Sequence, residues 1–479
     1  MRQEQAQRPC AGSRLLMVLP TICLLAAALV GVIVGVKSVR PEWQTGLLSM
    51  RTLQPLHAFL GVSFVLTGLA AGTIIVLEQQ GGRFAGRGLF TGALVLFVVG
   101  SAGLIATGHG SGVEYVAWPI GMTVLIGGLF TILSVNVVRH LRTLACVSAE
   151  GAWLLGLGLV LVVLGLAERS SEVMAAPGMT RALTIEWHAL DTFFAGWNAA
   201  LYGLGMLAIC RPGERGRPLR SRWMFVLAAF CLLSTFGHHH YMSPQPAVLK
   251  SIALLASMLA AVSFVRHVWT LIRERGHKPG EGPPEQAFFR AAEVFTLAAI
   301  GSGVLLAIPH INIVLHGTLA IVAHSMGSMI GVNVMLILGI FVRYAGRNDP
   351  AWSIRLTRRV RWVGVALVLV CVDLLLAGAA EGILRLDLPF QEFDSRVRLW
   401  LVPLPAFGLV LAATIGLLCR EVWLGLQNIA GDAESVKVLR IIEAKPGASG
   451  VEPIQDEMEV GAKLAQARTV GAVSSADVE

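Results

Sequence analysis

The sequence has twelve histidines, and eight of them fall within or at the ends of long apolar segments. Histidine inside a membrane helix is energetically costly and tends to mark a functional interior. Neutral imidazole is a common protein ligand of heme iron, copper and non-heme iron. The set therefore predicts a buried site at which histidines bind metal, as heme iron or as a separate ion; the candidates are His57, His188, His238, His239, His240, His310, His316 and His324.

The apolar segments predict an all-α integral membrane protein. The chain has 479 residues, 55% hydrophobic and 14% charged, whereas a soluble domain is roughly 25% charged. About 20 apolar residues cross a hydrocarbon core as a helix, and runs of this length without alternation favour helices over barrel strands. Residues 1–428 are expected to form a twelve-helix transmembrane bundle, and the polar residues 429–479 a flexible cytoplasmic tail. The twelve runs lie near 15–36, 55–77, 88–107, 116–138, 152–167, 185–209, 222–241, 246–265, 288–309, 314–343, 360–384 and 399–425.

The basic residues predict how the helices are oriented. Lys and Arg gather in every second loop, for example at Arg139 and Arg142, whereas the segments 107–115 and 242–246 contain none. By the positive-inside rule both termini are cytoplasmic. The histidines of the second, sixth, seventh and tenth helices then share the outer half of the membrane. The net charge of +8 follows from the same loop bias and does not indicate nucleic-acid binding.

The histidine motifs resemble those of the catalytic subunit of the heme-copper oxygen reductase and nitric oxide reductase superfamily, in spacing and in helix number. RTLQPLH is similar to the segment that supplies one axial ligand of the low-spin heme, which implies this role for His57. H-G-T-x-x-x-x-A-H-x-M, from 316 to 326, is similar to the family's H-x-T-x-x-x-x-A-H-x-H and implies His324 as the proximal ligand of the high-spin heme. The remaining motifs imply His188, His238 and His239 as ligands of a non-heme metal. The resemblance thus implies two b-type hemes and a non-heme iron, with copper as the alternative.

The sequence departs from the family pattern at Met326. The family has a second low-spin heme histidine two residues after the proximal one, and this chain has a methionine there. Thioether sulfur ligates heme iron and raises its reduction potential. Residues two apart on a helix point to roughly opposite sides, so that His324 and Met326 could address two hemes. We predict a low-spin heme between His57 and Met326.

The helical turn after His188 bears on the substrate. Typical oxygen reductases of the superfamily have a tyrosine bonded to a metal-binding histidine, commonly four residues after the sixth-helix histidine, where this chain has Thr192. Nitric oxide reduction needs no such tyrosine, and that branch typically has a glutamate here. Asp191 shares a helix face with His188 and could act as metal ligand or proton relay. The predicted enzyme is an oxidoreductase that converts 2 NO, two electrons and two protons to N2O and water. An atypical terminal oxygen reductase that reduces O2 to water is the alternative, and a non-catalytic heme protein or a transporter is a further one.

Three further acidic residues have expected roles around this centre. GVEYVAWP at 112–119 resembles the G-R-E-Y-L-E-x-P segment of nitric oxide reductases, which implies that Glu114 binds a calcium ion bridging the heme propionates. Val113 and Ala117 depart from that segment, at its arginine and its second glutamate. Glu381 and Asp373 are acids within the eleventh apolar run and candidate proton carriers.

The source of electrons is expected to lie outside the chain. None of the seven cysteines forms a C-x-x-C-H motif, so nothing predicts a covalently attached heme. The expected donor is a partner subunit carrying cytochrome c or a cupredoxin, or else quinol. The expected location is the cytoplasmic membrane, in contact with lipid.

Overall fold

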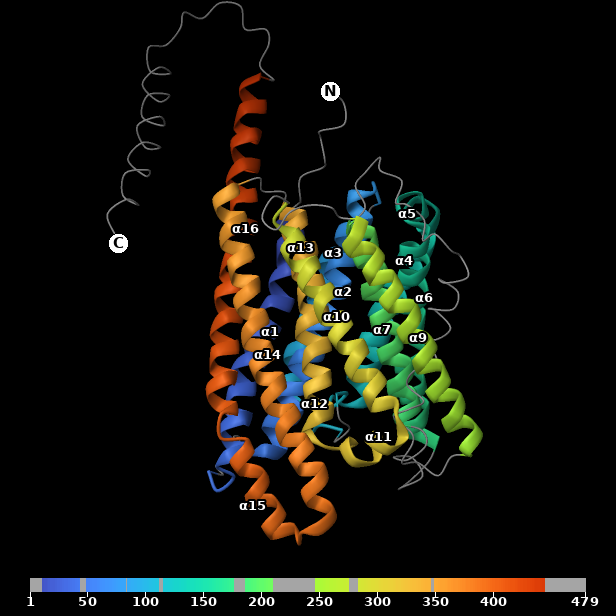
Figure 1. Ribbon diagram of the computed structural model, residues 1–479. Coiled ribbons are helices and arrows are strands. Elements are labelled where there is room, and N and C mark those ends of the chain that lie inside the picture. Colours follow the sequence, from blue (N-terminus) through green and yellow to red (C-terminus); the bar gives the residue numbers. More distant parts are fainter. Residues whose placement is uncertain are drawn as a thin grey trace, which may run out of the picture. The chain divides into compact units, whose positions relative to one another are not determined.

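The computed structural model describes most of the chain as helices joined by short connections (Figure 1). The chain divides into two compact units, Met1–Ile429 and Ala430–Glu479. In the second unit the described residues, 430–443, belong to a helix, and the expected flexibility of the remaining tail stays a prediction. The described residues are 11–43, 49–82, 84–111, 115–175, 186–209, 246–274, 283–345 and 349–443.

These residues contain helices and no strand. The first six helices are α1 (Ala11–Val39), α2 (Met50–Gln79), α3 (Arg87–Ala106), α4 (Ile120–Arg139), α5 (Leu141–Val147) and α6 (Ala149–Ala175). The others are α7 (Glu186–Ile209), α9 (Ala247–Glu274), α10 (Glu285–Ala307), α11 (Pro309–Leu315), α12 (Leu319–Met326), the π-helix η4 (Gly327–Val334), α13 (Met335–Ala345), α14 (Pro350–Asp387), α15 (Phe390–Trp400) and α16 (Leu404–Glu443).

Ten of the described helical segments are long and apolar enough to cross a membrane. They coincide with ten of the twelve expected runs, including the short fifth one, which lies within the span Ala149–Ser170. The run near 246–265 falls on α9, whose described apolar part is the shorter stretch Lys250–Ser263. The run 222–241, with its three histidines, lies outside the described residues. The all-helical membrane class is therefore confirmed, and the full number of twelve stays a prediction.

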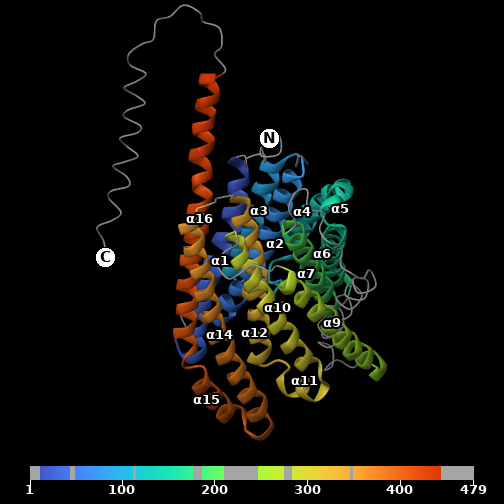
Figure 2. The same cartoon turned by 45° about the horizontal axis from the view of Figure 1, so that its top comes forward.

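The tenth apolar run is not the single continuous helix that its hydropathy indicates. It consists of α12, η4 and α13, and the short α11 precedes it. Gly317 lies between α11 and α12 with a φ of +72°, a left-handed conformation that glycine adopts without steric cost. The helix that carries His324 therefore begins at a sharp corner, at the end of the bundle where α11 and α15 lie (Figures 1 and 2).

Glycines let α6 and α7 approach closely, and these two helices make the most extensive contact of any pair in the described chain. A Cβ atom on Gly158 would lie 2.3 Å from the backbone nitrogen of Ala200, and one on Gly196 would lie 2.6 Å from that of Val162. Small residues at such positions permit van der Waals packing of backbones in a membrane. The pairing holds α7, the helix that contains His188, against α6.

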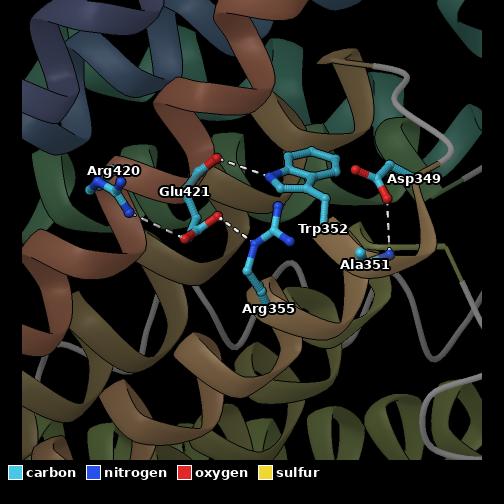
Figure 3. Close-up of polar contacts among 6 residues, drawn as sticks. All are labelled: Asp349, Ala351, Trp352, Arg355, Arg420 and Glu421. Carbon is cyan, nitrogen blue, oxygen red and sulfur yellow. Dashed lines mark hydrogen bonds and ion pairs between the residues drawn. The ribbon is translucent and has the colours of Figure 1, made fainter. Parts of the chain in front are cut away.

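A polar cluster joins the beginning of α14 to α16 (Figure 3). Glu421 is almost fully buried, and its two carboxylate oxygens face two arginines. Arg355 donates to Oε2 at 3.3 Å, and Nη1 of Arg420 lies 3.7 Å from Oε1. The indole of Trp352 donates to the Glu421 carbonyl oxygen at 3.0 Å. A buried carboxylate needs such partners, so the cluster fixes how the two helices pair.

Glu421→Gln should lower the stability of this helix pair by roughly 1 kcal/mol, because the carboxylate is buried while both arginines are partly exposed to solvent. The measurement is the thermal unfolding midpoint of the detergent-solubilised protein. Arg396→Gln is the control, since its pair with Glu392 is exposed on both sides and should contribute little. Equal midpoints for both variants would show that the cluster does not stabilise the fold.

Candidate functional site

His57 lies in the second turn of α2 and turns its ring toward α1. Its Nδ1 lies 2.9 Å from the carbonyl oxygen of Ala27. A carbonyl oxygen only accepts, so Nδ1 carries the hydrogen and Nε2 keeps a free lone pair. Gly31 makes room for the ring, because a Cβ atom there would lie 2.7 Å from Cε1 of His57. The imidazole is therefore held in the tautomer that a metal ligand needs.

His324 lies on α12 and faces α10. Its Nδ1 is 2.8 Å from the hydroxyl oxygen of Ser302, and a Cβ atom on Gly303 would meet Cε1 of the ring at an ordinary 3.5 Å. Ser302 also lies 2.9 Å from the carbonyl oxygen of Ala298, one turn earlier on α10. His324 thus has the same arrangement as His57, with Nδ1 engaged by the protein and Nε2 directed elsewhere.

Helix α14 supports the corner that precedes α12. Glu381 accepts a hydrogen bond from the backbone N–H of Leu319 at 2.9 Å, at the N-terminus of α12. A carboxylate in this position satisfies an unpaired amide and interacts favourably with the helix dipole. One turn later, Arg385 donates to the carbonyl oxygens of Ile313 and Val314, each at 2.8 Å, and of His316 at 3.1 Å. The expected proton carrier Glu381 is thus also a helix cap, and its proton-carrying role stays a prediction.

The methionine proposed as a heme ligand precedes the π-helix. Met326 is partly buried against the hydrophobic core. Three residues later Met329 packs near Gly61, one turn after His57 on α2, with its Cε 3.9 Å from where a Cβ of Gly61 would lie. Asn333 donates to the Met329 sulfur at 3.6 Å. Met329 is thus a second thioether beside the face of α2 that carries His57. The family motif ends at residue 326 and therefore gave no signal for Met329.

A buried arginine on α6 fixes the loop that follows Glu114. Arg169 donates to the carbonyl oxygens of Val116 at 2.7 Å and Trp118 at 3.0 Å, and its guanidinium lies 5.6 Å from the Trp118 ring centre. The Trp118 ring packs edge-on against Phe59, two residues after His57. The loop therefore packs against α2 within one helical turn of His57. A single arginine within an apolar span is the signal that could have identified Arg169 in the sequence.

The structure describes some of the remaining predicted residues and leaves others outside the described part of the chain. His188 lies on α7, and Asp191 is half-buried on the same helix. Asp373 is buried on α14, and its Oδ2 has no hydrogen-bond partner among the described residues. No group of three or more metal-ligating His, Cys, Asp or Glu occurs in the described part of the chain. The side chain of His188 and the residues His238, His239 and Glu114 lie outside the described residues.

The described histidines fit heme iron as a ligand set. His57 and His324 come from different helices, and the protein engages Nδ1 of each. Metal-ligating histidines almost always use the second ring nitrogen in this way, which fixes the tautomer and raises the basicity of the ligand.

Comparison with known proteins identifies the family. The profile described as cytochrome c and quinol oxidase polypeptide I matches residues 13–410 of this chain. The chain belongs to this family. A cryo-EM structure of a heme-copper terminal oxidase dimer has a similar fold, with a TM-score of 0.63 and 13% sequence identity over 87% of this chain and 84% of that one. No curated protein matches the sequence.

As a polypeptide I of this family, the chain is a catalytic subunit of the heme-copper oxidase superfamily. It is an oxidoreductase and a multi-pass protein of the cytoplasmic membrane, and its family implies hemes and a binuclear metal centre. The superfamily and the location expected from the histidine motifs and the hydropathy are thereby confirmed.

Proposed function

We propose that this polypeptide I is a nitric oxide reductase, which converts 2 NO, two electrons and two protons to N2O and water. The observation that carries the proposal is the residue pair after His188. Thr192 stands four residues later on α7, where oxygen reductases of the family commonly have the tyrosine that assists O–O cleavage, and Asp191 precedes it. A carboxylate on this face favours iron, a harder metal than copper(I), as the non-heme metal.

The chain's own residues have distinct roles in this proposal. His57 and Met326 hold the low-spin heme, and His324 holds the high-spin heme. His188, His238 and His239 would hold the non-heme iron. When bound, the hemes and this iron supply the electrons and the coordination sites at which NO is reduced.

Acidic residues supply the protons and shape the surroundings in this proposal. Asp191 lies on the face of α7 that bears His188 and delivers protons to, or ligates, the metal. Glu381 and Asp373 on α14 carry protons within the membrane, which the burial of Asp373 supports. Glu114 binds calcium in the loop that Arg169 anchors beside α2.

The proposal includes a topology and a donor. Twelve helices span the membrane with both termini in the cytoplasm, so that the ligand-bearing ends of α2, α7 and α12 lie toward the outer side. Electrons come from a partner subunit that carries cytochrome c or a cupredoxin, or from quinol, because the chain contains no C-x-x-C-H motif for a heme of its own.

The decisive experiment is metal analysis of the purified holoprotein, combined with NO and O2 electrode assays on the same sample. We expect two b-type hemes, a third iron and no copper per chain, together with NO consumption in the presence of an artificial electron donor. One copper per two hemes with O2 consumption would instead identify an oxygen reductase. If the protein reduces NO, Asp191→Asn should lower NO turnover strongly. Unchanged turnover in this variant would show that Asp191 has no role in the mechanism.

A further inference from the structure

The hydrogen bond between Ser302 and His324 is the contact from which this inference starts. The hydroxyl oxygen lies 2.8 Å from Nδ1 of the imidazole. Ser302 belongs to α10 and His324 to α12, so the contact joins two helices across the corner at Gly317. Unlike the acceptor of His57, which is the main-chain carbonyl of Ala27, this partner is a side chain.

The direction of this hydrogen bond follows from counting protons. A serine hydroxyl has one hydrogen to donate. The Ser302 oxygen lies 2.9 Å from the carbonyl oxygen of Ala298 and 3.1 Å from that of Ala299, and both can only accept, so the hydroxyl hydrogen points toward these carbonyls. The same oxygen must then accept from Nδ1–H of His324. The lone pair of the imidazole is thereby confined to Nε2, the nitrogen available to a metal.

The chain from the Ala298 carbonyl through the hydroxyl to the ring also polarises the imidazole. Consecutive hydrogen bonds of this kind strengthen one another. An Nδ1–H that donates makes Nε2 more basic, and a more basic axial ligand favours ferric over ferrous heme iron. The side chain at position 302 therefore affects both the tautomer of His324 and its electron donation.

We infer that Ser302 is a positioning residue that sets the ligand strength of His324 and hence the reduction potential of the high-spin heme. The inference rests on the proposed role of His324 as proximal ligand. At His57 the equivalent acceptor is a backbone carbonyl, which no side-chain substitution removes. A side-chain substitution at this hydrogen bond can therefore change the reduction potential of the high-spin heme, but not that of the low-spin heme.

The test uses the intact purified holoprotein and three variants of α10. Ser302→Ala removes the acceptor, and Ser302→Thr retains a hydroxyl. Thr296→Val is the matched control. Thr296 lies on the same helix, and its hydroxyl donates to the carbonyl oxygen of Ala292, one turn earlier. The readouts are heme content and a spectroscopic redox titration that resolves the two hemes.

We expect Ser302→Ala to raise the midpoint potential of the high-spin heme and leave that of the low-spin heme unchanged. Ser302→Thr and Thr296→Val should both match the unsubstituted protein. An unchanged high-spin potential in Ser302→Ala, or an equal shift of both hemes, would overturn the inference. Failure of the proposed function has a different signature, namely copper or missing heme in the unsubstituted protein.

Discussion

His324→Gly should yield a protein that retains the low-spin heme and lacks the high-spin one. Nε2 of His324 is the proposed protein ligand of that iron. No other histidine of α12 can replace it, since His324 is the one histidine in this helix. NO consumption should fall by more than about 100-fold, because even changes to groups that only orient a metal ligand cost 10–100-fold. The measurements are heme content, the reduced-minus-oxidised spectrum and the NO electrode.

His57→Ala is the matched comparison, and it should show the reverse pattern. The low-spin heme should be lost while the high-spin spectrum remains. Met326→Leu and Met329→Leu then distinguish the two thioethers, because only the true ligand should convert the low-spin signal to high-spin when it is replaced. If His324→Gly and His57→Ala lost the same heme, the assignment of the two ligands to separate hemes would be wrong.

Gly378→Ala should prevent correct heme binding although it changes a residue on α14 that is not a proposed ligand. A Cβ atom at this position would lie 2.0 Å from the backbone nitrogen of Ala320 and 2.7 Å from the carbonyl carbon of Leu319. Neither atom belongs to a flexible side chain, so α12 must move away from α14. Overpacking of this kind typically costs about 1–3 kcal/mol, and here it displaces the helix that carries His324 and Met326. Heme content and the thermal unfolding midpoint are the measurements.

The control for Gly378→Ala lies on the same helix. A Cβ atom on Gly364 would meet only the Phe295 ring, at an ordinary 3.7 Å, so Gly364→Ala should retain both hemes and a midpoint no lower than the original. The two substitutions have the same effect on helix propensity, and a difference between them reports packing alone. Full heme content in Gly378→Ala would show that close contact between α12 and α14 is not required to position the ligands.

Hydropathy and histidine spacing were sufficient to predict the class of protein. Ten apolar runs correspond to ten spans because the cost of burying backbone polar groups in lipid depends on local sequence alone. The motifs around His57 and His324 identified the superfamily for a similar reason. Spacing on a helix determines which residues can address a metal, and a motif records that spacing directly.

Only the tertiary structure decided how those ligands are held. The cap that Glu381 provides, the carbonyl contacts of Arg385 and the partner Ser302 all join residues far apart in the chain. No periodicity in the sequence encodes such pairs, because each depends on how separate helices pack. Hydropathy thus determined that the chain spans a membrane, and histidine spacing predicted that it binds metal, whereas packing between α10 and α12 decided which nitrogen of His324 is available for that role.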